Sequence, residues 1–227
     1  MKDNAMPPEN DIELLARLEK DYDLGYDAQT EDRYYAVDKK SRIAKPLEPS
    51  TNSELYRELQ LASRLDRDTL PTQRNLIAAL QHAMQIASKN PLILSQRACR
   101  IGDDVWYDLK DDDGNALRIS ADRTNLSVER TPDSVCWLRG STMKKIEMPD
   151  PLPIIDPKSQ FRRFADLIRQ DDNTAAQLIA VAVHCLIHPA GPSSQPPLVL
   201  LEGPQGSGKS TTSLLLHDLT DPETNRV

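Results

Sequence analysis

The sequence predicts an α+β N-terminal region, made of a helical pair and a small antiparallel meander, followed by the start of a P-loop α/β domain. Apolar residues recur at helical spacing within residues 51–90, and they alternate at strand spacing, between turn signals, within residues 92–138. Near the C-terminus an apolar run, a glycine-rich loop and another helical pattern follow one another directly, which is the order of a P-loop unit.

For residues 1–50 the sequence predicts a leader, followed by a loosely organised segment that contains a helix and a strand. Asn10, a residue type favoured at helix N-caps, precedes a helical pattern at residues 11–22. The apolar face of that helix is expected to hold Ile12, Leu14, Leu15 and Leu18. A Tyr-Tyr-Ala-Val run at residues 34–37 predicts a short strand.

Residues 51–148 predict an α+β accessory domain that begins with the helical pair. The TNSE pattern at residues 51–54 is typical of a capping box with Thr51 as the N-cap, and Thr72 precedes the second helix. The buried stripes of the two helices are expected to hold Leu55, Leu59 and Ala62, and then Leu76, Leu80, Ala83 and Ala87. The Asn-Pro pair at residues 90–91 should end the second helix.

The meander is predicted from short strand patterns that turn signals separate. One strand is expected within residues 92–101 and, after a Gly-Asp turn, a second in which Val105, Tyr107 and Leu109 alternate with exposed positions. The Asp-Gly pair at residues 113–114 predicts a hairpin before Leu117 and Ile119. Further strands are expected at residues 126–129 and 135–138.

A Pro-rich linker is expected at residues 149–158, ahead of a helical lead-in and truncated P-loop NTPase domain at residues 159–227. The apolar face of the first lead-in helix is expected to hold Phe161, Phe164, Leu167 and Ile168. The second helix, from about residue 172 to residue 188, is apolar almost all round, so we expect it to be buried.

The most specific motif in the chain is the GPQGSGKS sequence at residues 203–210, a complete P-loop (Walker A) pattern. The apolar residues 198–201 before it predict a buried parallel strand, and residues 211–217 after it predict a helix. The nucleotide-binding residues are therefore expected to be Gly203, Pro204, Gln205, Gly206, Ser207, Gly208, Lys209, Ser210 and Thr211.

Each residue type in the loop suits a nucleotide phosphate. Glycines let the backbone turn tightly and aim its N–H groups at an anion, to which the positive end of the following helix adds. Lys209 is expected to reach the β- and γ-phosphates, and the hydroxyl of Ser210 is expected to bind Mg²⁺. ATP and Mg²⁺ are the cofactors that follow, with the base preference left open.

ATP hydrolysis needs more than this loop. A second strand usually ends in an acidic residue that holds the metal and positions water, and 17 residues after Ser210 are too few to supply further parallel strands. We therefore expect a P-loop domain truncated after the loop's helix and unable to hydrolyse ATP efficiently alone. No catalytic residue is assigned.

The order of these blocks resembles the ATPase proteins of phages and integrative elements that are related to primase-associated, superfamily-3-like helicases. The resemblance covers roughly residues 55–227, and only its P-loop is specific. Its other matching segments are VWYDL at 105–109, Gly114 with LRIS at 117–120, CWLR at 136–139, the prolines at 149–153, the apolar run at 198–201 and LTDP at 219–222.

The resemblance implies the ATP-binding portion of a mobile-element DNA-replication ATPase or helicase-like protein. Its implied partners are DNA and a primase or full-length ATPase subunits, with oligomers expected only if the ATPase domain is complete. One alternative is a non-enzymatic DNA- or protein-docking module with a vestigial P-loop, in which residues 50–150 carry the function. Another is a small-molecule kinase with the same loop, which the long N-terminal region disfavours.

Composition excludes several other classes of protein. A net charge of −7 argues against a chain that binds nucleic acid over its whole surface, although it leaves a local basic patch open. Cys99, Cys136 and Cys185 are widely spaced and form no metal-binding pair, so reduced thiols are expected. No apolar stretch reaches the roughly 20 residues of a bilayer span, and no secretory signal precedes the first helix, so we expect a cytoplasmic protein with no membrane partner.

Four weaker patterns each have a functional and a structural interpretation, and the structural one is favoured in every case. His184 and His188 have the spacing of a zinc pair but no third ligand, and the aspartates at 111–113 lack the end ligands of a calcium loop. Trp106 and Tyr107 could stack a base, but packing is favoured. A cluster that could contact DNA, but that is more typical of a solvated face, holds Lys144, Lys145, Arg162, Arg163 and Arg169.

Overall fold

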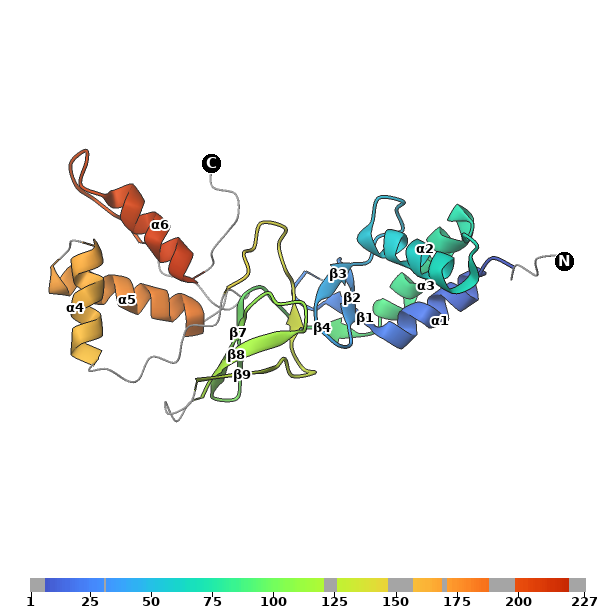
Figure 1. The fold of residues 1–227 in the computed structure, drawn as a ribbon, viewed down its shortest axis with the longest axis horizontal. Helices are drawn as coiled ribbons and strands as arrows, with labels where there is room; N and C mark the ends of the chain where they lie inside the picture. Colours follow the sequence, from blue (N-terminus) through green and yellow to red (C-terminus); the bar gives the residue numbers. More distant parts are fainter. Residues whose placement is uncertain are drawn as a thin grey trace. The chain divides into compact units, whose positions relative to one another are not determined.

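The fold is a mixed α+β arrangement, as the sequence predicts (Figure 1). The computed structural model describes residues 7–30, 32–120, 126–146, 157–168, 171–187 and 199–220. Its contacts define two compact units, and each unit is described by itself. The first unit comprises Met1–Leu94 and Pro132–Leu138, and the second comprises Ser95–Thr131 and Arg139–Val227.

The first unit packs three helices and a four-stranded sheet. Its helices are α1 (Asp11–Asp21), α2 (Glu54–Arg67) and α3 (Gln73–Ala87). The sheet has the order β3-β2-β1-β4, with strands β1 (Tyr22–Asp27), β2 (Tyr34–Asp38), β3 (Ala44–Pro46) and β4 (Pro91–Leu92). Strands β1, β2 and β3 are antiparallel neighbours, and β4 runs parallel to β1. The helix expected at residues 11–22 and the strand expected at residues 34–37 are present as α1 and β2, and β1 and β3 form beside them in the segment that was expected to be loose, because both strands pair with β2.

Polar side chains fix where the three helices begin. Asn10 and Glu13 form the reciprocal bonds of a capping box at α1, and the hydroxyl of Thr72 accepts the Asn75 N–H at α3. The N-cap of α2 is Ser53, whose hydroxyl accepts the Tyr56 N–H at 3.2 Å, so the helix begins two residues later than the TNSE pattern predicted with Thr51 as the N-cap. Thr51 is exposed ahead of the helix, so the capping-box prediction there is wrong.

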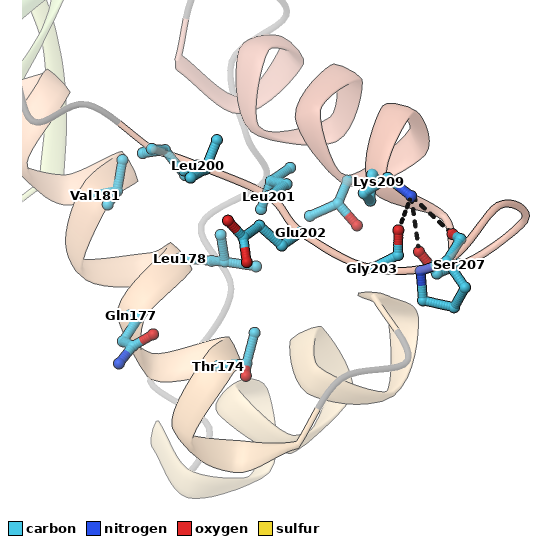
Figure 2. A pocket seen from close by; sticks show the side chains of 13 residues that line it. Thr174, Gln177, Leu178, Val181, Leu200, Leu201, Glu202, Gly203, Ser207 and Lys209 are labelled. Atoms are coloured by element: carbon cyan, nitrogen blue, oxygen red, sulfur yellow. Dashed lines mark hydrogen bonds between the residues drawn. The ribbon is translucent and has the colours of Figure 1, made fainter.

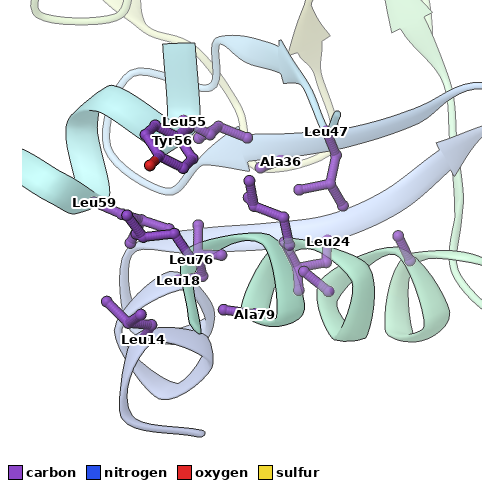
Figure 3. Close-up of a cluster of buried hydrophobic side chains, with 13 residues drawn as sticks. Leu14, Leu18, Leu24, Ala36, Leu47, Leu55, Tyr56, Leu59, Leu76 and Ala79 are labelled. Atoms are coloured by element: carbon purple, nitrogen blue, oxygen red, sulfur yellow. The ribbon is translucent and has the colours of Figure 1, made fainter. Parts of the chain in front are cut away.

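One apolar cluster holds the helices and the sheet of the first unit together (Figure 3). Its buried side chains come from the three helices, the strands and the residue after β3. They are Leu14, Leu18, Leu24, Ala36, Leu47, Leu55, Tyr56, Leu59, Leu76, Ala79, Leu80, Ala83 and Ala87. Ile12 is 70% exposed, which corrects its placement on the buried face. It precedes Leu14 by two residues, a rotation of about 200° around a helix.

Residues of Pro132–Leu138 complete the first unit by returning to its sheet. Arg42, which is buried, donates from Nη2 to the Asp133 carbonyl at 2.6 Å and from Nε to the Val135 carbonyl at 3.2 Å. Its Nη1 pairs with Asp23 at 2.6 Å. Strand β10 (Cys136–Trp137) follows, and fully buried Trp137 bridges to Ile43.

The antiparallel meander of the second unit has the strand order β6-β7-β8-β9, as the hairpin signals predict. Its strands are β6 (Ala98–Ile101), β7 (Asp104–Asp108), β8 (Asn115–Ile119) and β9 (Leu126–Arg130). The single strand expected within residues 92–101 is divided into β4, β5 (Leu94–Ser95) and β6, because β4 pairs with β1, β5 with β10 and β6 with β7. β7 is buried on both faces, so the expected half-buried alternation does not hold there.

A buried ion pair fixes the chain that follows the meander. The carboxylate of Asp108, which is fully buried, accepts from Arg139 Nε at 2.8 Å and from Arg139 Nη2 at 2.7 Å. Arg139 also donates to the Asp111 carbonyl at 2.7 Å, at the hairpin between β7 and β8. Such two-pronged pairing satisfies both charges and holds residue 139 beside the end of β7.

Three helices complete the described part of the second unit: α4 (Pro157–Ile168), α5 (Asp172–Ile187) and α6 (Lys209–Thr220). Ala165, Ile168, Ala175 and Leu178 form their buried core. Leu167 is 67% exposed and Val183 is 43% exposed, so Leu167 leaves its predicted face and α5 is not buried all round. Residues 149–156 of the predicted linker lie outside the described residues, and residues 157–158 begin α4. No helix in the described ranges is long and apolar enough to cross a membrane.

The core of the first unit yields a direct stability prediction. Leu80→Ala removes a side chain with no exposure, so we expect the free energy of unfolding to fall by about 2–5 kcal/mol. Leu65→Ala is the matched control, because Leu65 also lies in a helix but is 76% exposed; its effect should stay within about 0.5 kcal/mol. Chemical denaturation of dilute protein measures both, and equal losses in the two variants would contradict this core.

Candidate functional site

The glycine-rich loop at residues 203–210 leads directly into α6. Ahead of it, residues 199–203 are not a strand, so the predicted strand is wrong for its described part; Leu198 lies outside the described residues. A strand needs a hydrogen-bonded neighbour, and no described strand pairs with residues 199–203. Leu200 is 75% exposed, whereas Leu201 packs against the core of α4 and α5.

The loop turns on glycines, as expected. Gly203, Gly206 and Gly208 have φ angles of 151°, 81° and 81°. A Cβ on Gly203 would lie 2.8 Å from the Ser207 hydroxyl oxygen, so any other residue there would displace that hydroxyl from its present position. Open space surrounds the Cβ positions of Gly206 and Gly208, where the requirement is the left-handed backbone itself.

The ammonium of Lys209 is folded back into the loop (Figure 2). Its Nζ donates to the Gly203 carbonyl at 2.8 Å, to the Pro204 carbonyl at 2.7 Å and to the Ser207 hydroxyl at 3.3 Å. Three acceptors from both limbs of the loop thus converge on one cation. This arrangement places a positive charge inside the loop, where an anion would be bound.

The start of α6 adds further favourable groups for an anion. The first hydrogen bond of the helix runs from the Thr212 N–H to the Gly208 carbonyl at 2.9 Å. The backbone N–H groups at the start of α6, before Thr212, therefore have no carbonyl partner within the helix. The first turn carries no acidic residue, and Ser210 and Thr211 are exposed. The N-terminal end of the helix dipole is therefore directed at the loop, with no carboxylate in the first turn of the helix to compete for it.

A hydrogen bond also holds the C-terminal end of α6 in place. The hydroxyl of Tyr107, on β7, donates to the Thr220 carbonyl at 2.8 Å. This bond satisfies one of the carbonyls that a helix leaves unpaired at its C-terminus. Together with Leu215 and Leu216, which pack against α4 and α5, it fixes the direction in which α6 points.

Two cavities flank the loop. The first, of about 520 Å³, lies between α5 and the segment that leads into the loop (Figure 2). It is lined by Thr174, Gln177, Leu178, Val181, residues 199–204, Ser207, Lys209 and Thr212. The second, of about 330 Å³, is lined by Leu167, Ile168, Gly206, Ser207, Gly208, Thr211, Thr212 and Leu215. The sequence motif did not identify the α4 and α5 residues, because their approach to the loop is a matter of tertiary packing.

The N-cap of α5 positions one wall of the first cavity. Asp171 accepts the N–H groups of Asn173 and Thr174 at 3.0 Å each and the Thr174 hydroxyl at 2.7 Å. The bonds from Thr174 hold the pKa of this exposed carboxyl below its usual value. Thr174 is thereby fixed at the start of the helix that faces the loop.

Two of the weaker sequence candidates have structural roles in the described ranges. Trp106 and Tyr107 are both buried, as the packing interpretation predicts. Asp111 accepts bonds from Asn115 across the hairpin, and no group of three potential metal ligands occurs in the described ranges. His188 and Arg169 lie outside those ranges. Among the other basic candidates, Lys144, Lys145, Arg162 and Arg163 are exposed.

Neither cysteine whose side chain is described offers a nucleophile. Burial raises the pKa of the Cys99 thiol to about 12, although a hydrogen bond with Ser95 opposes that shift. Burial also raises the pKa of Cys136, against the opposing influence of the neighbouring Arg42 guanidinium. Both thiols are free of disulfides.

No family model, curated protein or solved structure matches this chain.

The buried thiols lead to a labelling prediction. A pKa of about 12 keeps the thiolate fraction of Cys99 at pH 8 about a thousandfold below that of an ordinary thiol. We therefore expect N-ethylmaleimide to leave Cys99 and Cys136 largely unmodified in the native protein and to modify both in guanidinium chloride, as mapped by mass spectrometry. Labelling should rise with pH as the thiols ionise. Rapid native labelling of Cys99 at pH 8 would contradict its burial.

Proposed function

We propose that residues 203–210 bind the phosphates of ATP together with Mg²⁺, and that this chain is the ATP-binding portion of a mobile-element DNA-replication ATPase or helicase-like protein. The observation that carries the proposal is the convergence of three glycines with positive φ, the start of α6 and the Lys209 ammonium on one loop. The wider assignment rests on the order of sequence blocks described above.

The lysine has a clear role in this proposal. Without phosphate its ammonium is held by two neutral carbonyls and a hydroxyl, all within 3.3 Å. Phosphate oxygens are charged acceptors and form stronger hydrogen bonds with an ammonium. Binding would therefore draw Lys209 Nζ from the carbonyls toward the β- and γ-phosphates, and the flexible side chain permits that movement.

Ser210 and Thr211 supply the remaining polar groups. Ser210 is exposed in the first turn of α6, where its hydroxyl would bind Mg²⁺, and Thr211 follows on the same turn. The metal would neutralise phosphate charge. No acidic residue is assigned to catalysis, so the proposal covers binding and not efficient hydrolysis by this chain alone.

The partners and the compartment belong to the same proposal. DNA and a primase or full-length ATPase subunits are the partners implied by the resemblance, and the cytoplasm is the compartment. Exposed Arg162 and Arg163 are candidates for contacts with such partners, because their guanidinium groups lie on the solvent side of α4.

Binding of a fluorescent ATP analogue in the presence of Mg²⁺ tests the proposal. We expect saturable binding by the unchanged chain and at least about tenfold weaker binding by Lys209→Ala, which loses the charged donor. Lys89→Ala is the matched control, since Lys89 is exposed and lies at the end of α3 in the other unit; it should bind like the unchanged chain.

The other outcome is equally informative. Equal or absent binding in the unchanged chain and Lys209→Ala would refute phosphate binding by the loop. The function would then be sought in the docking module of residues 50–150. Circular dichroism of each variant checks that the substitution has left the fold intact.

A further inference from the structure

The outward face of α2 carries an apolar pair at its centre. Leu61 is 58% exposed and Leu65 is 76% exposed, and their spacing of four residues stacks them on one side of the helix. The opposite side of α2 is fully occupied, because Leu55 and Leu59 pack into the core of the first unit. The two outer leucines therefore contribute nothing to that core.

Charged residues of opposite sign stand at the two ends of this apolar pair. Arg57 lies one turn before Leu61, and Asp68 lies just after the helix, three residues beyond Leu65. Both residues are exposed, as is Arg64 at the edge of the same face. Within the described residues, the side chains of Arg57 and Asp68 form no hydrogen bond or ion pair. We refer to Arg57, Leu61, Leu65 and Asp68 as the α2 face.

We propose that the α2 face binds a second copy of this chain, with helix packed on antiparallel helix about a two-fold axis. A two-fold contact must be self-complementary, so each residue has to meet a suitable partner from the same face. An axis at the level of Ser63 places Leu61 of one copy opposite Leu65 of the other. The four leucines then form a continuous apolar centre.

The same axis brings the opposite charges together. Arg57 precedes Ser63 by six residues and Asp68 follows it by five, so Arg57 of one copy and Asp68 of the other lie within about 1.5 Å of the same height along the helices. The two residues also lie toward the same side of the leucine stripe, at about −40° and −20° from Leu61. Two symmetric ion pairs therefore flank the apolar centre. A parallel arrangement would instead set arginine beside arginine and aspartate beside aspartate.

The contact is small, and its affinity should reflect that. A single pair of helices covers less than the roughly 1,600 Å² of a standard interface, so we expect a dissociation constant on the order of 10–1,000 µM. The contact lies in the first unit and does not rest on the proposed nucleotide site. It gives the chain a means of self-association that is independent of any ATPase ring.

Sedimentation equilibrium of the full chain over a wide concentration range tests the proposal. We expect a reversible monomer–dimer equilibrium that Leu65→Glu weakens at least about tenfold, because it places two carboxylates in the apolar centre. Ile93→Glu is the matched control, as Ile93 is 70% exposed and lies outside the α2 face; it should dimerise like the unchanged chain. A chain that stays monomeric to about 1 mM, or a dimer that Leu65→Glu leaves unchanged, would overturn the proposal.

A charge exchange tests the antiparallel register. Arg57→Glu and Asp68→Arg should each weaken the dimer, because each sets like charges opposite one another, and the double variant should restore it to within about threefold. Asp68 has a φ of 54°, so Asp68→Arg carries the same backbone strain in the single and the double variant. The comparison between them therefore isolates the ion pair. Failure of the double variant to recover would refute the antiparallel pairing.

Discussion

The ammonium of Lys209 is the group on which the glycine-rich loop depends. Backbone carbonyls that turn inward in a tight loop repel one another, and here two of them accept bonds from the same cation at 2.7 and 2.8 Å. The positive φ angles of the three glycines make this inward turn possible, and α6 supplies the lysine as its first residue. The loop thus holds a positive charge within a ring of its own acceptors.

The support for this loop comes from helices and not from a sheet. Leu201, just before the loop, packs with Leu215 and Leu216 of α6 against the core of α4 and α5. The Tyr107 hydroxyl binds the carbonyl at the other end of α6. These contacts fix both ends of the segment formed by the glycine-rich loop and α6, while residues 199–203 have no strand neighbour in the described part of the chain. A binding site that rests on such support would gain order when a ligand bridges the loop.

Features that depend on neighbouring residues in the sequence could be predicted from it. The cap at Asn10, the start of α3 near Thr72, the buried stripe of α3 and the hairpins of the meander all follow from spacing and turn chemistry, and the structure confirms them. Features that depend on residues far apart in the sequence could not be predicted in this way. The apolar run before the P-loop has the composition of a strand, but pairing decides whether a strand forms.

The division of the chain into two units also depends on partners that are distant in the sequence, so it could not be predicted. Nothing local in residues 132–138 indicates that they belong with the first unit, since the bonds from Arg42 span more than 90 residues of sequence. The predicted boundary before residue 51 fails for a similar reason, because Leu14 and Leu18 join the same core as Leu76. In the candidate site, the motif identified the loop residues, whereas Thr174 and Gln177 reach it only through the packing of α5.

The central claim, that the loop receives phosphate, is tested most directly at its own amides. The chain has eight glycines, so glycine-selective ¹⁵N labelling gives a simple NMR spectrum that single Gly→Ala variants can assign. On titration with Mg²⁺ and ATP, we expect the Gly206 and Gly208 signals to shift and saturate, while those of Gly25 and Gly102, in β1 and in the meander, stay in place. Loop glycines that do not respond, or a uniform change of all signals, would contradict phosphate binding at this loop.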